Sequence, residues 1–291
     1  MVSETLGFVP VAKYRKAMST DRTDGSEAVS ASAAAPDARG AASQRYAAQG
    51  FIVIPGAIDP VACRRFGRSV QTEFSKLHAR RVTMSGSLAG HLNFSMGPGG
   101  RELLSLIKAA GIPELLARLA GEPLVLAQAM GNLNIPGSTY QNYHIDGAFD
   151  RRSMIVNVCL ISTDETNGAT ELVRTSNLSK QSYWRFRRDV QTCRCVRPVL
   201  DPGDILIRPS NLWHRGTPNW SGEPRPMAAF VYTPPIHLDG IDPEAELSRP
   251  IVISGNKFYG HFRWLKEVIA VKLPWLDDAM RQGRSWLGER Q

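Results

Sequence analysis

The hydrophobic positions divide the chain into a helical first part and a strand-rich second part. Within 60–77, apolar residues recur at the spacing of one helix face, at Ala62, Phe66, Val70 and Phe74. Asp59 and Pro60 come directly before this face and supply a capping carboxylate and a first-turn proline. We therefore predict a short strand followed by three helices, at 51–54, 60–77, 101–109 and 113–120.

From about residue 122 onward, short apolar runs bounded by turn residues replace the helical period. The predicted strands are 124–130, 133–135, 140–144, 153–161, 170–173, 193–199, 204–208 and 226–233. A helix near 179–188 interrupts them. About eight short strands are typical of a double-stranded β-helix, or jelly roll. The sequence thus predicts a mainly β fold with flanking helices, built as a jelly roll or cupin-like barrel.

The two ends of the chain differ from this central region. Residues 1–43 are rich in Ala, Ser, Asp and Gly and offer little apolar surface, so we expect them to be disordered. Residues 44–291 are predicted to form a single domain, because no internal repeat divides them. The tail from 239 onward is expected to be helical, above all at 262–271.

The segment 80–100 carries many Gly, Ser and Met residues and few periodic signals. Long irregular segments in compact domains often have a function, so we interpret this one as a mobile cover over a binding site. His91 and Asn93 are its polar candidates for contact with a substrate. The alternative is an ordinary surface loop with both side chains in water.

Candidate metal ligands occur at His144, Asp146 and His214. The first two are two residues apart, so in an extended chain their side chains leave on the same face. Two histidines and one carboxylate on one side of an octahedron leave three positions open, as in non-haem Fe(II) oxygenases. Arg225 follows eleven residues after His214, and its planar charged fork fits a carboxylate. The alternative for each histidine is a packed or solvated residue.

These residues and their surroundings resemble the Fe(II)/2-oxoglutarate oxygenases, and in particular the phytanoyl-CoA dioxygenase branch. The resemblance runs from about Tyr46 to Pro235. His-x-Asp alone arises often by chance, but here it belongs to an ordered set of features. They are the strand at 49–56 followed by a helix, His-x-Asp at 144–146 with its later His and Arg, Asn-Gly-Ala-Thr-Glu-Leu at 167–172, Asp-Pro-Gly-Asp at 201–204 and His-Arg-Gly-Thr-Pro-Asn at 214–219.

The resemblance implies an enzyme that binds Fe(II) through His144, Asp146 and His214 and uses 2-oxoglutarate and O2 as cosubstrates. It also implies that Arg225 binds the far carboxylate of 2-oxoglutarate. Candidates for secondary contacts with the cosubstrate are Gln128, Asn132, Asn157 and Thr163, each of which could instead be a satisfied barrel residue. Related halogenases have a small residue in place of the carboxylate, so Asp146 argues against halogenation.

The implied reaction is oxidation of an unactivated C–H bond, by hydroxylation or, with another fate of the substrate, by desaturation, ring closure or epimerisation. No acyl-CoA site is evident, so the family name does not indicate the substrate. We expect a small polar metabolite and, by analogy, a role in natural-product or antibiotic biosynthesis. Residues 174–177 read Arg-Thr-Ser-Asn where relatives commonly have Pro-Gly-Ser-His, which indicates an altered loop near the entrance. Two alternatives remain: a non-catalytic jelly-roll binding protein, and a cupin-like metal enzyme that does not use 2-oxoglutarate.

Charge and composition narrow the choice of partners. The formal net charge is +8, but the basic residues are mostly scattered arginines, so we do not expect a nucleic-acid partner. No apolar run is long enough to span a bilayer, and the start of the chain lacks the apolar stretch of a secretory signal. The four cysteines show no zinc or disulfide-framework spacing. The sequence predicts a cytoplasmic protein and leaves its oligomeric state open.

Overall fold

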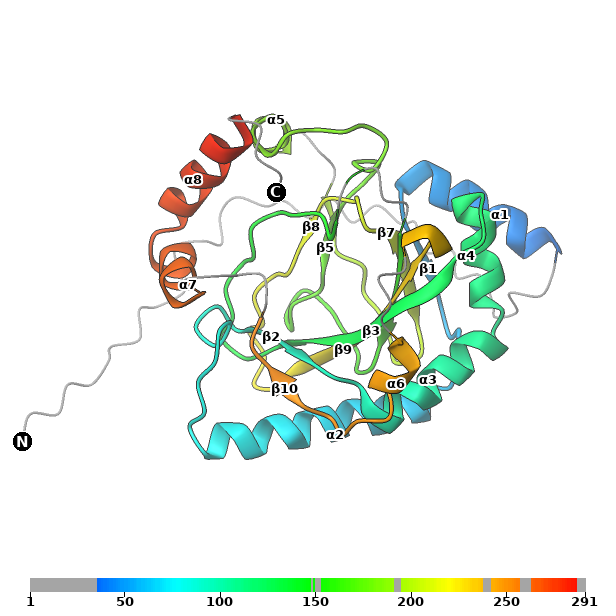
Figure 1. The fold of residues 1–291 in the computed structure, drawn as a ribbon, viewed down its shortest axis with the longest axis horizontal. Coiled ribbons are helices and arrows are strands. Elements are labelled where there is room, and N and C mark those ends of the chain that lie inside the picture. The colour runs from blue at the N-terminus through cyan, green and yellow to red at the C-terminus, as the bar shows by residue number, and fades with distance from the viewer. Residues whose placement is uncertain are drawn as a thin grey trace, which may run out of the picture.

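Two antiparallel sheets form the centre of the computed structural model, which describes residues 36–147, 149, 153–190, 195–237, 242–256 and 263–286 (Figure 1). The larger sheet has the strand order β1-β7-β4-β9-β3-β2-β10. Its strands are β1 (Ile52–Ile54), β2 (His91–Phe94), β3 (Val125–Asn134), β4 (Met154–Cys159), β7 (Ile205–Pro209), β9 (Arg225–Thr233) and β10 (Ile253–Ser254). The smaller sheet, of order β6-β5-β8, contains β5 (Glu171–Val173), β6 (Cys195–Val196) and β8 (His214–Arg215). The described part of the chain is therefore built on antiparallel β-sheets with flanking helices, as the sequence predicts.

The helices lie around these sheets (Figure 1). Four precede the strand-rich region: α1 (Pro36–Gln49), α2 (Pro60–Ala79), α3 (Gly97–Ala109) and α4 (Ile112–Ala120). The later ones are α5 (Tyr183–Asp189), η3 (Pro235–His237), α6 (Pro243–Glu246), α7 (Arg263–Lys272) and α8 (Pro274–Trp286). The predicted cap of α2 is present, because the Asp59 carboxylate accepts hydrogen bonds from the amides of Val61 and Ala62 at 2.9 and 3.2 Å.

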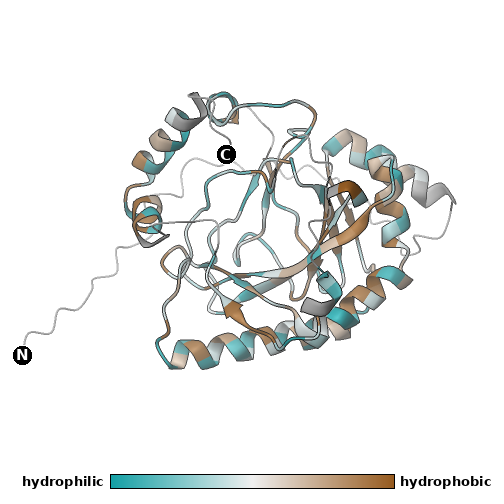
Figure 2. Cartoon of the chain, in the orientation of Figure 1, coloured by the Kyte–Doolittle hydropathy of each residue, from teal (hydrophilic) through white to brown (hydrophobic). Residues whose placement is uncertain are grey.

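Strand alternation gives the large sheet one face for the core and one for a cavity. On β9, Ala228, Phe230 and Tyr232 belong to the main hydrophobic core, together with buried residues of α2, α3 and α4. The intervening residues of β9, from Arg225 to Thr233, line a cavity on the opposite face. Side chains on a strand point alternately to its two faces, so each strand contributes to both. Figure 2 shows hydrophobic and hydrophilic residues mixed along α2, as expected of a helix that buries one face.

Four predicted segments differ from the structure. The predicted strands 124–130 and 133–135 are one strand, β3, with a register shift between Leu126 and Gln128. The segment 140–144 is no regular strand, and only His144 makes an isolated bridge, to His214. The segment 80–100 is not an irregular cover throughout, because it contains β2 and the start of α3.

The ends of the chain are described in part. Most of the segment predicted to be disordered, 1–43, lies outside the described residues, and there the prediction is untested. Its last part is helical, because α1 begins at Pro36. Among the described residues, no helix combines the length and the apolar character needed to cross a membrane.

Candidate metal centre

Three potential metal ligands meet between the two sheets. The backbones of His144 and His214 exchange two hydrogen bonds of 3.0 Å, which places their rings 4.4 Å apart between centroids. Asp146 follows two residues after His144, at a bend in the chain. One ligand atom from each of the three residues lies within 4.8 Å of the other two. These residues can therefore contact a single ion, which is the arrangement that the spacing of His144 and Asp146 predicts.

Backbone carbonyls orient both imidazoles. Nδ1 of His144 lies 2.9 Å from the carbonyl oxygen of Asn142, and Nδ1 of His214 lies 2.9 Å from that of Leu212. Because a carbonyl only accepts, each Nδ1 carries a proton, and Nε2 is the ring nitrogen that can face a metal ion. Nε2 is also the atom nearer to Asp146, at 3.7 Å in His144 and 3.3 Å in His214. Metal-binding histidines are typically fixed in this way.

The protonation states also suit a cation. Burial and the neighbouring His214 lower the pKa of His144 to about 3, so this imidazole is neutral at pH 7. Burial alone would raise the pKa of Asp146, but His214 and Arg208 outweigh it and hold that pKa well below its usual range. Nη2 of Arg208 lies 2.5 Å from Oδ2 of Asp146. His144 and Asp146 would therefore not need to lose a proton to bind a metal ion at neutral pH.

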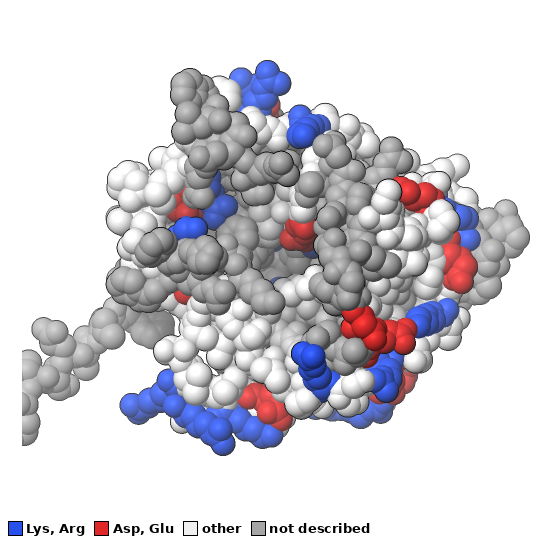
Figure 3. All heavy atoms as spheres, in the orientation of Figure 1, with Lys and Arg blue, Asp and Glu red and all other residues white. Residues whose placement is uncertain are grey.

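The three residues border a cavity of about 560 Å³ between the sheets. Figure 3 shows a hollow on the face viewed, with acidic and basic atoms inside it. Of the residues proposed for cosubstrate contacts, Gln128, Asn132 and Asn157 line this cavity. Thr163 is not among the lining residues, and its buried hydroxyl donates to the carbonyl of Ile161 at 3.0 Å.

Arg225 lines the same cavity and is 4% exposed. Its Nη2 donates to the carbonyl of Gly168, while Nε has no hydrogen-bond partner among the described residues. Burial lowers the pKa of Arg225 to about 10, so the guanidinium is still charged at pH 7. A buried cation with an unsatisfied donor is costly unless an anion binds it. The position predicted for a carboxylate anchor therefore fits that ligand.

His91 and Asn93 lie on β2, so the interpretation of both as residues of a mobile loop is wrong. Both line the cavity. His91 is 6% exposed, and its Nε2 is 2.7 Å from the carbonyl oxygen of Thr139. Burial lowers the pKa of His91 to about 4, so it is a neutral donor with its hydrogen bond already made. Contact of either residue with a substrate is still a prediction.

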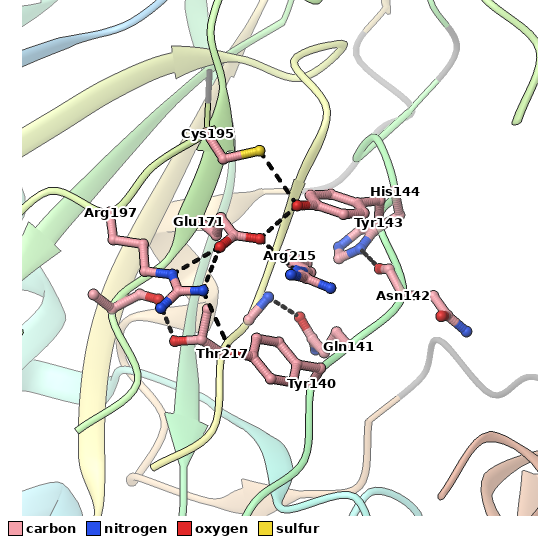
Figure 4. Close-up of polar contacts among 12 residues, drawn as sticks. Tyr140, Gln141, Asn142, Tyr143, His144, Glu171, Cys195, Arg197, Arg215 and Thr217 are labelled. Atoms are coloured by element: carbon pink, nitrogen blue, oxygen red, sulfur yellow. Dashed lines mark hydrogen bonds and ion pairs between the residues drawn. The ribbon is translucent and has the colours of Figure 1, made fainter. Parts of the chain in front are cut away.

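Sequence reasoning missed a buried cluster around Glu171, which Figure 4 shows near His144. Glu171, on β5, is 2% exposed and accepts hydrogen bonds from the hydroxyl of Tyr143 and from Nε of Arg215 and of Arg197, the last two at 2.6 and 2.7 Å. Tyr143 precedes His144 and Arg215 follows His214. Alternation along each segment turns the histidine toward the cavity and its neighbour toward Glu171. The Glu171 cluster thus connects the two histidine-bearing segments.

Two arginines near this cluster, Arg197 and Arg187, are paired with acidic side chains. The side chain of Arg197 is 16% exposed and is paired with Glu171. Nε of Arg187 lies 2.8 Å from Oδ1 of Asp278 on α8. A signal for the cluster was present, since Glu171 belongs to the Asn-Gly-Ala-Thr-Glu-Leu motif. Its partners could not be identified because they lie on other segments.

Comparison with known proteins identifies the same family that the sequence motifs resemble. The family model for phytanoyl-CoA dioxygenase (PhyH) matches residues 46–227. The epimerase SnoN, solved with Fe3+, alpha ketoglutarate and nogalamycin RO, has a TM-score of 0.56 and 20% identity, over 68% of this chain and 84% of SnoN. The alpha ketoglutarate dependent carbocyclase SnoK from nogalamycin biosynthesis has a TM-score of 0.54 and 17% sequence identity. The match covers 76% of this chain and 88% of SnoK. AviO1 from Streptomyces viridochromogenes Tue57 has a TM-score of 0.55 and 19% sequence identity, and the match covers 68% of this chain and 95% of AviO1. The structural likenesses confirm the predicted jelly-roll fold.

Proposed function

Because this chain belongs to the phytanoyl-CoA dioxygenase family of Fe(II)/2-oxoglutarate-dependent oxygenases, we propose that it oxidises an unactivated C–H bond of a small polar metabolite. The observation that carries the proposal is the meeting of His144, Asp146 and His214 in a cavity that also holds the buried Arg225. When bound, iron and 2-oxoglutarate supply the activation of O2. The protein supplies binding, orientation and exclusion of competing reactions.

The residues present fit both groups. Nε2 of His144, a carboxylate oxygen of Asp146 and Nε2 of His214 would hold Fe(II), because their donor types and mutual distances suit one ion. Arg225 would pair with the far carboxylate of 2-oxoglutarate, since a planar guanidinium matches that group. The amides of Gln128, Asn132 and Asn157 line the same cavity and would supply further hydrogen bonds. Thr163 lies outside it, so we do not include it in the proposal.

Hydroxylation is our default reaction, with desaturation, ring closure and epimerisation as variants. The similarity in fold to an epimerase and a carbocyclase supports keeping these variants open. SnoK belongs to nogalamycin biosynthesis, and we propose by analogy that the present chain also acts in natural-product biosynthesis.

One assay distinguishes the proposed function from two others, a non-catalytic binding protein and a metal enzyme that does not use 2-oxoglutarate. Purified protein is incubated with Fe(II), O2 and 2-oxoglutarate, with and without candidate metabolites, and succinate is measured. Succinate formed in step with an oxidised metabolite supports the proposal. Metabolite binding without succinate formation would favour a non-catalytic binding protein. Metabolite conversion that does not consume 2-oxoglutarate would favour a cupin-like metal enzyme instead.

Replacing Arg225 with alanine should weaken 2-oxoglutarate binding about tenfold to a hundredfold, because a charge-assisted hydrogen bond contributes about 1.5–3 kcal/mol. Arg225→Lys should recover only part of the loss, since an ammonium is a point charge and cannot form the planar fork. The measurement is the dissociation constant of 2-oxoglutarate for the Mn(II)-loaded protein, in which turnover does not interfere.

The matched control is Arg65→Ala, which removes an exposed arginine paired with Glu102 on the surface. It should leave the dissociation constant unchanged. An unchanged constant in Arg225→Ala would mean that the cosubstrate carboxylate binds elsewhere, with Arg208 and Arg215 as the next candidates.

A further inference from the structure

The cavity contains a second buried arginine, Arg208. It lies on β7 and is 5% exposed. Its Nη2 pairs with Asp146 at 2.5 Å, but Nε and Nη1 have no hydrogen-bond partner among the residues that the structure describes. A guanidinium carries five N–H donors, so one carboxylate oxygen at Nη2 leaves most of them unused. Buried donors without a partner are costly and are usually satisfied by some ligand.

The strand register separates Arg208 from Arg225. Arg208 is opposite Ile155 on β4, and Ile155 is opposite Val231 near the far end of β9. Arg225 begins β9, six residues earlier, which corresponds to about 20 Å along a strand at about 3.3 Å per residue. The backbones of the two arginines therefore lie far apart along the sheet, while both long side chains line the same cavity. The Arg208 guanidinium contacts Asp146, so it lies next to the candidate metal centre.

The charges of the cavity do not balance without a further anion. Its described lining residues include two arginines, Arg208 and Arg225, and one carboxylate, Asp146. If the proposed function holds, a divalent iron and the two carboxylates of 2-oxoglutarate cancel each other. One positive charge then remains in excess in a buried site. Since an uncompensated buried charge is unfavourable, a ligand that carries one negative charge will bind best.

The surroundings of Arg208 indicate where this charge would sit on the ligand. Ile155 and Val231, its neighbours across the sheet, are apolar and line the cavity. Gln128 on β3 is opposite Val231 and also lines the cavity. The cation thus lies at the edge of an apolar surface, which suits a molecule with an anionic group attached to a carbon skeleton.

We propose that the substrate carries a carboxylate, and that Arg208 selects it by donating hydrogen bonds from the guanidinium while one donor holds Asp146. The inference rests on the proposed function and adds the substrate class to it. A carboxylate is favoured over a phosphate ester because the excess is a single charge. Arg208 would then discriminate a carboxylic acid from its neutral amide by a charge-assisted contact.

The test uses full-length protein saturated with Mn(II) and 2-oxoglutarate, which blocks turnover. Hexanoate and phenylacetate are titrated against their primary amides and against hexyl phosphate, and binding is followed by calorimetry at constant ionic strength. In the wild type each carboxylate should bind about tenfold to a hundredfold more tightly than its amide, which corresponds to about 1.5–3 kcal/mol for a charged hydrogen bond. Arg208→Gln should bring the acid and the amide to within about twofold of each other. Arg208→Lys should keep part of the preference.

Two controls separate this inference from the proposed function. Arg225→Gln should weaken 2-oxoglutarate binding and leave the acid–amide ratio intact. Arg208→Gln should lose the acid–amide ratio and still bind 2-oxoglutarate once Mn(II) is raised to saturate the variant, because Arg208 also pairs with the metal ligand Asp146. Equal binding of acid and amide by the wild type, no binding of either acid, or a stronger preference for hexyl phosphate would overturn the carboxylate assignment. Loss of 2-oxoglutarate binding in folded Arg208→Gln would reassign this arginine to the cosubstrate. A wild type that does not bind 2-oxoglutarate at all would instead refute the proposed function.

Discussion

His214→Ala should reduce Mn(II) affinity by at least about a hundredfold and remove turnover, while the protein stays folded. The substitution deletes one of three donors, and loss of even a group that only supports a metal ligand typically costs about tenfold to a hundredfold. The fold should persist because the bridge between His144 and His214 is made by main-chain atoms, which alanine retains. Metal binding is measured by titration with Mn(II), turnover by succinate formation and folding by thermal denaturation.

His144→Ala should behave in the same way, because its Nε2 faces the same point as that of His214. The matched control is His78→Ala, which removes a histidine in the last turn of α2 that stacks on Phe74. That variant should keep metal affinity and turnover. Full succinate formation in His214→Ala would show that iron is held by other residues.

The metal centre could be predicted from the sequence because its defining relationship is local. Side chains at His144 and Asp146 leave an extended segment on the same face whatever the rest of the chain does. The segment did not need to be a regular strand: one bridge between His144 and His214 suffices in the structure. His214 required the family resemblance, because no local rule connects it to the other two residues.

Arg208 and the Glu171 cluster could not be predicted in this way. Their roles depend on partners brought together by the sheets, such as Asp146 for Arg208 and Arg215 for Glu171. A single sequence gives the strand pattern but not which strands become neighbours. Arginines on a strand therefore looked like ordinary polar positions, and only tertiary structure shows that they are buried and paired.

The strand β2 was missed for a related reason. Its residues lie in a stretch rich in Gly, Ser and Met, and pairing with β3 is what makes them a strand. Phe94 lies opposite Gly131, where an added Cβ would come within 1.9 Å of the Phe94 ring. The ring occupies the space that this glycine leaves, so Phe94 and Gly131 specify the pairing together. Neither residue indicates this when it is considered alone.

Glu171→Ala should lower the free energy of unfolding by about 3–5 kcal/mol, the usual effect of removing one member of a buried ion pair. Glu171 is 2% exposed, and its loss leaves Arg215 and Arg197 without their shared carboxylate. Both arginine side chains retain some contact with solvent, so we expect a value near 3 kcal/mol. Urea denaturation measures the change. Glu244→Ala, which breaks the exposed Glu244–Lys108 pair, is the control and should alter stability little.

The pH dependence of this effect identifies the charge of Glu171 as its cause. Burial alone would raise the pKa of Glu171, but Arg215, Tyr143 and Arg197 outweigh it and hold that pKa below its ordinary value of 4.5. A carboxyl whose pKa is lower in the folded state stabilises the protein above its unfolded pKa, and this contribution is lost as pH falls through the folded pKa. The stability difference between wild type and Glu171→Gln should therefore be constant above about pH 5.5 and shrink below about pH 4.5. A difference that stays the same down to pH 3 would show that Glu171 stabilises the histidine-bearing segments by packing and not by its charge.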